Sequence, residues 1–279
     1  DLSRNEISKT PKALKALKHL EKLDLQYNQL TQIAPEIWQL SNLTALNVGG
    51  NKISILPSEI QHLSRLKELI VAENKLLSLP PAIGMLKELS RLAASKNQLT
   101  ELPASFWGLT NLEELQMWDN HLSTWPESLG NFSKLTMLGL SKNQITTLPT
   151  ALTTFDSLKY LNLSQNQLTD LPQGFGHLIQ LDWLEIWDNN LSVLTPEIGS
   201  LRQLTFLHLS NNRLTSIPEE IGQLSNLELL FLNKNQLSTL PQSIENLTNL
   251  CLLDLQENRF SLEERTRIKS LMPWCDVQF

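Results

Sequence analysis

Histidine and cysteine are the residues best suited to act as bases, nucleophiles or metal ligands, and this chain clusters neither of them. The histidines are scattered at His19, His62, His121, His177 and His208, and the cysteines are Cys251 and Cys275. There is no Cys-x-x-Cys pair and no pair of histidines at ligand spacing. The sequence also lacks phosphate-binding, metalloprotease and serine-hydrolase motifs. We therefore predict no active site, no metal site and no cofactor.

Large aromatic residues beside acidic ones offer a different chemistry, which suits recognition rather than catalysis. The tripeptide Trp-Asp-Asn occurs twice, at Trp118-Asp119-Asn120 and at Trp187-Asp188-Asn189. Indole rings dominate the energetic centres of protein interfaces, and they can also stack on sugar rings. The repeat in which each tripeptide lies decides how its side chains are presented.

The repeat is visible in its asparagines, which recur every 23 residues along the whole chain. They are Asn5, Asn28, Asn51, Asn74, Asn97, Asn120, Asn143, Asn166, Asn189, Asn212, Asn235 and Asn258. The apolar residues keep one frame around them, as in Leu158-Leu161-Leu163-Asn166-Leu168-Leu171-Pro172-Phe175-Leu178. The unit is LxxLxLxxNxLxxLPxxIxxLxx, numbered so that the first Leu is position 1 and Asn is position 9. Such a fixed period indicates a stacked repeat protein.

Two periodicities within the unit predict its local structure. Apolar positions 4 and 6 alternate with variable positions 3, 5 and 7, which is the pattern of a short strand with one buried face. Positions 18, 21 and the next position 1 are three residues apart, and Pro at position 15 fixes φ before them. This spacing favours a 3₁₀ turn or short helix. Neighbouring units must stack to bury both faces, with their strands parallel.

The asparagine at position 9 is interpreted as structural. An amide carries both a donor and an acceptor, which suits the turn where the strand ends and backbone groups need partners. We expect every one of these asparagines to be buried and bonded to backbone. Pro35 and Pro196 lie one position late in the frame, so small irregularities are expected at those two places.

These motifs resemble the leucine-rich repeat family over essentially the whole chain. The 23-residue period with LPxxIxxL returns is most similar to bacterial, spirochaete-type members. The resemblance implies an α/β solenoid shaped as a horseshoe, with a parallel β-sheet on the concave face and short helical or 3₁₀ segments on the convex face. It also implies a protein-binding role, generally in contact with a host.

The domain organisation follows from the repeat. Residues 1–279 are expected to form one solenoid of about twelve repeats, and residues 261–279 to form a C-terminal cap. In the cap, Ser261 and Glu264 have capping-box spacing, Pro273 ends the helix, and residues 275–279 alternate like a strand. Leu2 falls at position 6, so the chain opens inside a repeat, and we expect that sequence upstream was removed.

Binding information can enter only where packing leaves residues free, above all at positions 3, 5, 7 and 8, which face the concave side. Repeats three to five carry small or charged residues there, such as Ala45, Gly49 and Glu68. Later repeats carry Trp118, Met137, Tyr160, Trp183, Trp187, Phe206, Leu229 and Phe231. The predicted binding residues are Trp118, Asp119, Tyr160, Trp183, Glu185, Trp187, Asp188, Phe206, His208 and Phe231.

An alternative role for these rings is to stack on one another across strands and stiffen the sheet. Three other tryptophans lie elsewhere in the frame and are interpreted as packing residues. Trp38 and Trp107 are at convex position 19, and Trp125 is at core position 14. Trp187, with Trp183 and Glu185 beside it, is expected to be the exposed centre of the binding patch.

Composition disfavours some classes of binding partner. The chain has 61 Leu and a net charge of −6, which disfavours nucleic acid and polybasic membrane anchoring. Its longest apolar runs are far shorter than the roughly 18 residues that cross a bilayer, so no membrane insertion is expected.

The leading hypothesis is a non-enzymatic module that binds a protein or peptide partner, from a host, on the concave face of its C-terminal half. One alternative is a carbohydrate-binding surface, and another is the substrate-recognition part of a larger effector enzyme.

Localisation is open between secretion or a bacterial cell surface and, alternatively, the cytoplasm. Sequons at Asn42, Asn131, Asn162, Asn190 and Asn246 arise easily in such a repeat and say little about secretion. Cys251 and Cys275 could approach each other at the cap, but free, packed thiols are favoured over a disulfide.

Overall fold

The computed structural model describes residues 1–125 and 132–279, so the sequon at Asn131 lies outside the described residues. Two compact units make up the chain. The first is Asp1–Ser123 with Leu129–Gly139, and the second is Thr124–Ser128 with Leu140–Phe279. Each unit is built from the same 23-residue coil.

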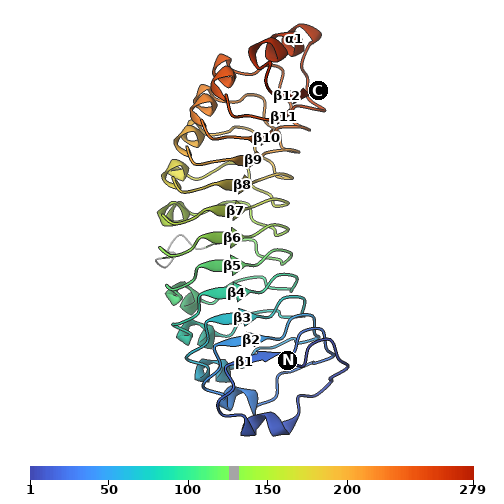
Figure 1. Cartoon of the computed structure of the whole chain (residues 1–279), viewed down its shortest axis with the longest axis vertical. Helices are drawn as coiled ribbons and strands as arrows, with labels where there is room; N and C mark the ends of the chain where they lie inside the picture. The colour runs from blue at the N-terminus through green and yellow to red at the C-terminus, as the bar shows by residue number, and fades with distance from the viewer. Residues whose placement is uncertain (126–131) are drawn as a thin grey trace. The chain divides into compact units, whose positions relative to one another are not determined.

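Six short strands form the sheet of the first unit and pair in chain order (Figure 1). They are β1 (Lys22–Asp24), β2 (Ala45–Asn47), β3 (Glu68–Ile70), β4 (Arg91–Ala93), β5 (Glu114–Gln116) and β6 (Met137–Gly139). Every pair is parallel, and the register joins residues 23 apart, as in Leu46 beside Leu69. The repeat length therefore sets the strand register.

Six strands of the second unit are arranged in the same way. They are β7 (Tyr160–Asn162), β8 (Trp183–Glu185), β9 (Phe206–His208), β10 (Leu229–Phe231), β11 (Leu252–Asp254) and β12 (Asp276–Gln278). The central residue of β7 to β11 is buried and the two flanking residues are half-buried. The flanking residues, at positions 3 and 5, therefore share one side of the sheet. We call this side, together with positions 7 and 8 that follow each strand, the sheet face; Trp187 at position 7, for example, lies beside His208 and Glu185 at position 5.

Short 3₁₀ segments return ten of the coils, as far as the structure describes them, on the other side of the strands. They are η1 (Lys12–Ala16), η2 (Ile37–Gln39), η3 (Ser58–His62), η4 (Pro81–Met85) and η5 (Ala104–Gly108) in the first unit, and η6 (Thr150–Thr154), η7 (Phe175–His177), η8 (Pro196–Ser200), η9 (Glu219–Gln223) and η10 (Gln242–Asn246) in the second. Most begin directly after a proline in extended conformation, as the position-15 Pro predicts. Parallel strands on one side and 3₁₀ segments on the other confirm the α/β solenoid class.

The late prolines behave differently from each other. After Pro35, η2 has only three residues, but η7, after the regularly placed Pro172, is equally short, so this length is not specific to the late proline. Beyond Leu194, however, η8 has the usual five residues, and the expectation of an irregularity at Pro196 is wrong. Thr195 takes the usual proline position with extended backbone, and its hydroxyl accepts a hydrogen bond from the Glu197 amide, so the turn starts normally.

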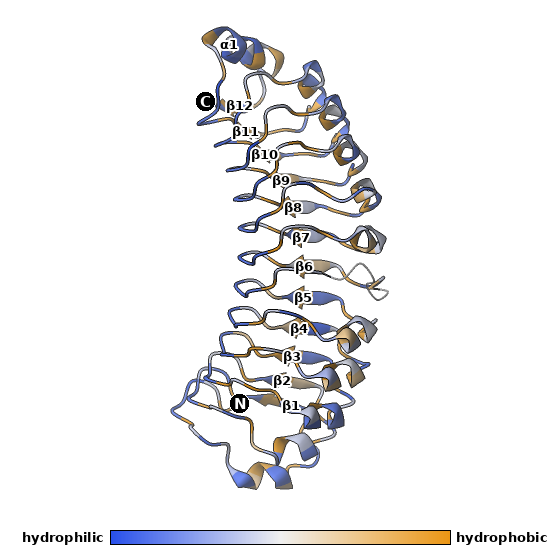
Figure 2. Ribbon diagram, turned by 180° about the vertical axis from the view of Figure 1, so that it is seen from behind, coloured by the Kyte–Doolittle hydropathy of each residue, from blue (hydrophilic) through white to orange (hydrophobic). Residues whose placement is uncertain are grey.

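The interior of each unit is filled by the leucine columns. Side chains such as Leu158, Leu161 and Leu163 are completely buried. Figure 2 shows hydrophobic residues recurring along the coils of each unit, whereas the loops away from the 3₁₀ segments are mostly hydrophilic. Burying apolar surface at about 25 cal/mol per Å² is the main stabilising contribution, and it is distributed evenly along the coils.

The asparagines form a ladder of hydrogen bonds between neighbouring coils. Asn166 donates through Nδ2 to the carbonyl of Leu163 in its own coil, at 2.9 Å, and to that of Leu140 in the preceding coil, at 3.0 Å. Its Oδ1 accepts from the backbone N–H of Ile145, also in the preceding coil, at 3.0 Å. One amide therefore satisfies backbone groups of two coils.

Asn5 is the exception to the predicted burial, because its side chain is exposed. It still donates to the carbonyls of Leu2 and Ser3, but its hydrogen bonds are all local. The expectation that every ninth position is buried is therefore wrong at the first coil. Asn258, in the last coil before the cap, is only half-buried.

The cap follows the last coil. Helix α1 (Leu262–Leu271) begins at Ser261, whose hydroxyl accepts from the Glu264 amide at 3.2 Å, as the capping box predicts. Hydrogen bonds from Arg267 hold the pKa of Glu264 down at about 2. Strand β12 pairs with β11, and Cys251 and Cys275 are free thiols, as predicted. No helix of the described residues is long and apolar enough to cross a membrane.

We expect Asn166→Ala to lower the free energy of unfolding by about 1–3 kcal/mol, because it leaves backbone groups of two coils without partners. Urea unfolding measures this. Gln167→Ala, at an exposed neighbouring position, is the control and should change stability by less than about 0.5 kcal/mol. If both variants unfold at the wild-type midpoint, the asparagines do not hold the coils together.

Candidate functional site

The sheet face of the second unit carries a group of aromatic side chains on neighbouring strands. We call it the aromatic cluster, and it consists of Tyr160, Trp183, Trp187, Phe206, His208 and Phe231. Because neighbouring coils are 23 residues apart in register, Tyr160, Trp183 and Phe206 lie side by side at position 3 of β7, β8 and β9. All six side chains are half-buried.

The rings at position 3 stack closely. The centroids of Trp183 and Phe206 are 3.7 Å apart with an interplanar angle of 5°, and those of Tyr160 and Trp183 are 6.4 Å apart at 26°. Since β8 lies between β7 and β9, the two faces of the Trp183 indole are covered by rings from the same unit. The stacking predicted as an alternative role for these residues is therefore present.

Glu185 lies at the centre of the cluster and organises it. Its Oε1 accepts from the indole N–H of Trp183 at 2.8 Å and from the hydroxyl of Tyr160 at 3.1 Å. Its Oε2 accepts from the indole N–H of Trp187 at 3.1 Å. One carboxylate thus holds three rings in place, and hydrogen bonds to a charged acceptor are stronger than neutral ones.

His208 and Phe231 continue the cluster along the next strands. The His208 ring is 5.8 Å from Trp187 and 4.9 Å from Phe231, measured between centroids. Burial lowers the pKa of His208 below its ordinary value of 6.5, although Glu185, Asp254 and Asp188 act to raise it. The imidazole is therefore neutral at physiological pH and acts as an aromatic surface.

Trp187 is less exposed than the sequence suggests. It is half-buried, because it packs near His208 and is tethered to Glu185. Ser164, at the same position of the preceding coil, is fully buried. The expectation of an exposed Trp187 is wrong, since cross-strand neighbours at this spacing shield one another.

Trp118 and Asp119 belong to the first unit, where they have a different environment. The Lys96 ammonium lies 5.1 Å from the centroid of the Trp118 ring, and it also forms an ion pair of 2.9 Å with Glu73. The hydrogen bond with Glu73, and further the charge of Asp119, raise the pKa of Lys96. Trp118 thus has a cation of its own unit over its ring.

Charge pairing is general on the sheet face of the first unit. Arg91 lies 3.1 Å from Glu68 and 3.1 Å from Glu114, on the strands at either side. In the second unit, the described residues of the same face contain one ion pair, between Lys234 and Glu257 at 3.7 Å. On the first unit's face, charged side chains therefore pair with one another. On the second unit's face, aromatic rings stack on one another instead.

The three tryptophans interpreted as packing residues do pack. Trp38 and Trp125 are buried. Trp107 is half-buried against Phe106, at 5.3 Å, and against Phe132, at 6.0 Å, between ring centroids. None of these three belongs to the candidate surface.

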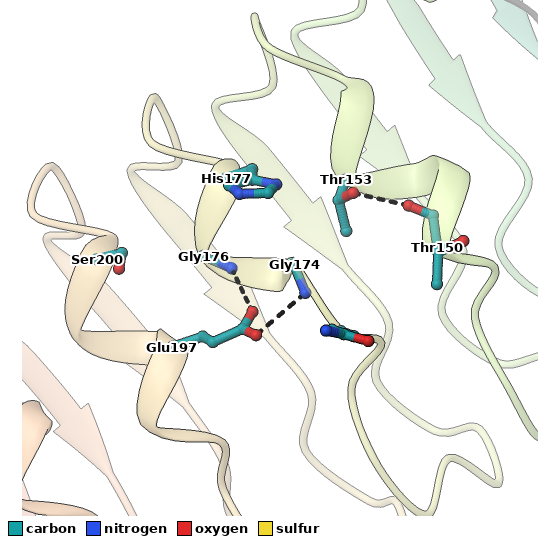
Figure 3. A pocket seen from close by; sticks show the side chains of 8 residues that line it. Thr150, Thr153, Gly174, Gly176, His177, Glu197 and Ser200 are labelled. Carbon is teal, nitrogen blue, oxygen red and sulfur yellow. Dashed lines mark hydrogen bonds between the residues drawn. The ribbon is translucent and has the colours of Figure 1, made fainter.

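A hollow of about 560 Å³ lies on the 3₁₀ side of the second unit (Figure 3). It is lined by Thr150, Thr153, Gln173, Gly174, Gly176, His177, Glu197 and Ser200. The Glu197 carboxylate already accepts the backbone N–H groups of Gly174 and Gly176, at 3.1 and 3.2 Å. The lining comes mainly from η6, η7 and η8, so the hollow lies on the side of the coils opposite the aromatic cluster.

Two features of the surface were not visible in the sequence pattern. The first is the bridging role of Glu185, which the pattern showed only as an acid among aromatics. The second is that position 8 adopts left-handed backbone, with φ of 60° at Asp119 and 53° at Asp188. Asp and Asn tolerate this conformation, but Lys, Glu and Gln also occupy it here, so the two aspartates are not required by the turn.

Sequence comparison identifies the family. The profile described as "Leucine-rich repeat region" matches residues 46–144 and 189–273, and the profile "Leucine rich repeat" matches residues 1–53 and 133–191. The chain belongs to the leucine-rich repeat family. No curated protein matches it significantly.

Solved structures of leucine-rich repeat proteins resemble the chain closely. A leucine-rich repeat protein of Leptospira interrogans is 34% identical, with 99% of this chain and 82% of that one covered and a TM-score of 0.70. The plant peptide hormone receptor RGFR1 in complex with RGF2 is 36% identical, with 90% and 42% covered and a TM-score of 0.81. An internalin of Listeria monocytogenes is 26% identical, with 99% and 84% covered and a TM-score of 0.79.

A lowered pKa of His208 has a measurable consequence for stability. The contribution of the neutral imidazole is fully present above about pH 6.5, and it is lost as the pH falls through the lowered pKa. We therefore expect the wild-type protein to lose more unfolding free energy than His208→Phe between about pH 7 and about pH 5.

Urea unfolding at both pH values measures this, with His62→Gln as a control at an exposed histidine. A pH dependence of His208→Phe identical to that of the wild type would contradict the neutral imidazole.

Proposed function

We propose that this leucine-rich repeat protein is a non-enzymatic recognition module that binds a protein or peptide on the sheet face of its second unit. The observation that carries this proposal is the aromatic cluster held by Glu185. Its two indole N–H groups and one phenol are satisfied by a single carboxylate. The half-buried rings therefore form a fixed, partly apolar surface before any partner arrives.

Such a surface favours binding for two reasons. Trp and Tyr are the side chains most enriched at interface hot spots. Side chains that are already fixed lose little conformational entropy on binding, which otherwise costs about 0.5–1.5 kcal/mol for each immobilised side chain. The core of each coil is formed by the leucines and asparagines, so the cluster is available for recognition.

The similar proteins support a recognition role. They include the plant peptide hormone receptor RGFR1 in complex with RGF2 and, at 33% identity, PEPR1-AtPEP1. The chain spans about two fifths of the length of these two proteins. We propose that the same kind of ligand, a peptide or an exposed protein segment, binds here.

We further propose that the protein is bacterial, acts at the cell surface or after secretion, and meets a host partner. The support is its similarity to proteins of Leptospira interrogans and Listeria monocytogenes over nearly the whole chain. Protease shaving of intact cells tests the location, since a surface protein is cleaved and a cytoplasmic one is protected.

The carbohydrate alternative is weaker on geometric grounds. A sugar ring stacks on an open aromatic face, whereas both faces of Trp183 are covered by Phe206 and Tyr160. Glu185, the acid placed best to bind hydroxyl groups, already accepts three hydrogen bonds. A recognition role within a larger effector enzyme would use the same surface, so it requires no different site.

The proposal is tested with a display library of random dodecapeptides selected on the purified protein. We expect Trp187→Ala to weaken binding of the selected peptides about thirtyfold, which corresponds to about 2 kcal/mol. Thermal melts check folding, and a modest loss of stability is expected because Trp187 is half-buried.

Trp274→Ala is the matched control, because Trp274 is 46% exposed and lies outside the cluster. Trp38→Ala is unsuitable, since Trp38 is buried in the first unit. Selected peptides that bind Trp187→Ala and Trp183→Ala as tightly as the wild type would rule out the sheet face as the binding surface.

A further inference from the structure

The two Trp-Asp-Asn tripeptides occupy the same positions of their coils but have different neighbours. In each, Trp is at position 7, Asp at position 8 has left-handed backbone, and Asn is in the ladder. In the first unit, position 8 of the coil before Trp118 is Lys96, whose ammonium lies 5.1 Å from the centroid of the indole ring. In the second unit the equivalent neighbour of Trp187 is Gln165, which is uncharged.

The rest of the first unit's arrangement is also absent beside Trp187. Glu73, which fixes Lys96 through an ion pair of 2.9 Å, corresponds to Lys142 in the second unit. Trp187 therefore has the indole and the adjacent aspartate of a cation site, without a cation supplied by its own coils. His208 packs near the ring and is kept neutral by burial, so it does not fill that role.

The charge of the surrounding surface favours a cation. From β7 to the turn after β11, the sheet face carries four carboxylates, Glu185, Asp188, Asp254 and Glu257, against the ammonium of Lys234, and a second ammonium, that of Lys142, lies in the turn after β6. Lys234 is already paired with Glu257. Asp188 accepts a hydrogen bond from Asn211 through Oδ1. Asp254 lies beside Phe231 on the next strand, at the far end of the cluster.

We propose that Trp187 and Asp188 receive a lysine or arginine side chain of the partner, in the position that Lys96 occupies over Trp118. This assignment rests on the proposed function and specifies its partner as a basic peptide segment. A cation over an indole face and beside a carboxylate is held by the ring quadrupole and by charge together. The aromatic cluster, which spans roughly 14 Å from β7 to β10, contacts the apolar residues of the peptide that flank this basic side chain.

The internal arrangement of the first unit supplies the test. The double variant Lys142→Glu with Gln165→Lys reproduces Glu73 and Lys96 beside Trp187, so the protein fills the site with its own lysine. Folding should be retained, because Lys and Glu already occupy this left-handed position in other coils. The control is Lys142→Glu alone, which makes the surface more acidic and leaves the site open.

The probes are dodecapeptides selected from the random library on the wild-type protein. We expect them to be enriched in Lys or Arg, and to lose at least tenfold in affinity when that residue is replaced by Gln. Against the double variant they should bind at least tenfold more weakly, whereas Lys142→Glu alone should bind them as tightly as the wild type or more tightly. Asp188→Asn should weaken binding, and Asp170→Asn, at an exposed position off the sheet face, should not.

The outcomes separate this inference from the proposed function. Peptides that need Trp187 but lack basic residues, or that bind the double variant normally, overturn the cation site and leave the recognition role intact. Peptides that depend on Trp183 but not on Trp187 also overturn the cation site alone. If no peptide depends on Trp187 or Trp183, the recognition role on this face fails, and the cation site fails with it.

Discussion

The asparagine at position 9 is the constraint on which the rest of the structure depends. Each chain turn after a strand leaves backbone donors and acceptors inside the protein, where an unpaired group costs about 1–3 kcal/mol. One amide, as in Asn166, meets this requirement for its own coil and for the preceding one. The coils must therefore repeat at a fixed length and in parallel register. This register brings position 3 of every coil beside position 3 of the next coil.

That register also explains how a surface can be built without disturbing the core. Leucines and asparagines account for the interior, and positions 3, 5, 7 and 8 are left to vary. In the first unit they carry a network of ion pairs around Arg91 and Lys96. In the second they carry stacked rings arranged around Glu185. The same scaffold thus presents two chemically different faces, one paired by charge and one covered by stacked rings.

Much of the fold could be predicted from the sequence, because the repeat makes every local signal appear many times. The strands, the 3₁₀ returns after proline and the capping box at Ser261 are present as expected. Two predictions were wrong for local reasons. Asn5 lies in the first coil and is exposed, and Thr195 takes the place of proline without disturbing η8. The candidate surface was predictable only as a set of residues. The burial of Trp187 and the hydrogen bonds that Glu185 accepts from three rings depend on side-chain contacts across strands. The pattern of residue types at each repeat position does not specify these contacts.

The most direct test of the central claim follows the indole N–H resonances of the seven tryptophans by NMR while a library-selected peptide is added. Each tryptophan reports on a known place in its unit. If the sheet face of the second unit is the recognition surface, the signals of Trp183 and Trp187 shift with the added peptide, and those of Trp38 and Trp125 stay in place. Shifts of Trp38, Trp107 or Trp125 with unchanged signals of Trp183 and Trp187 would contradict it.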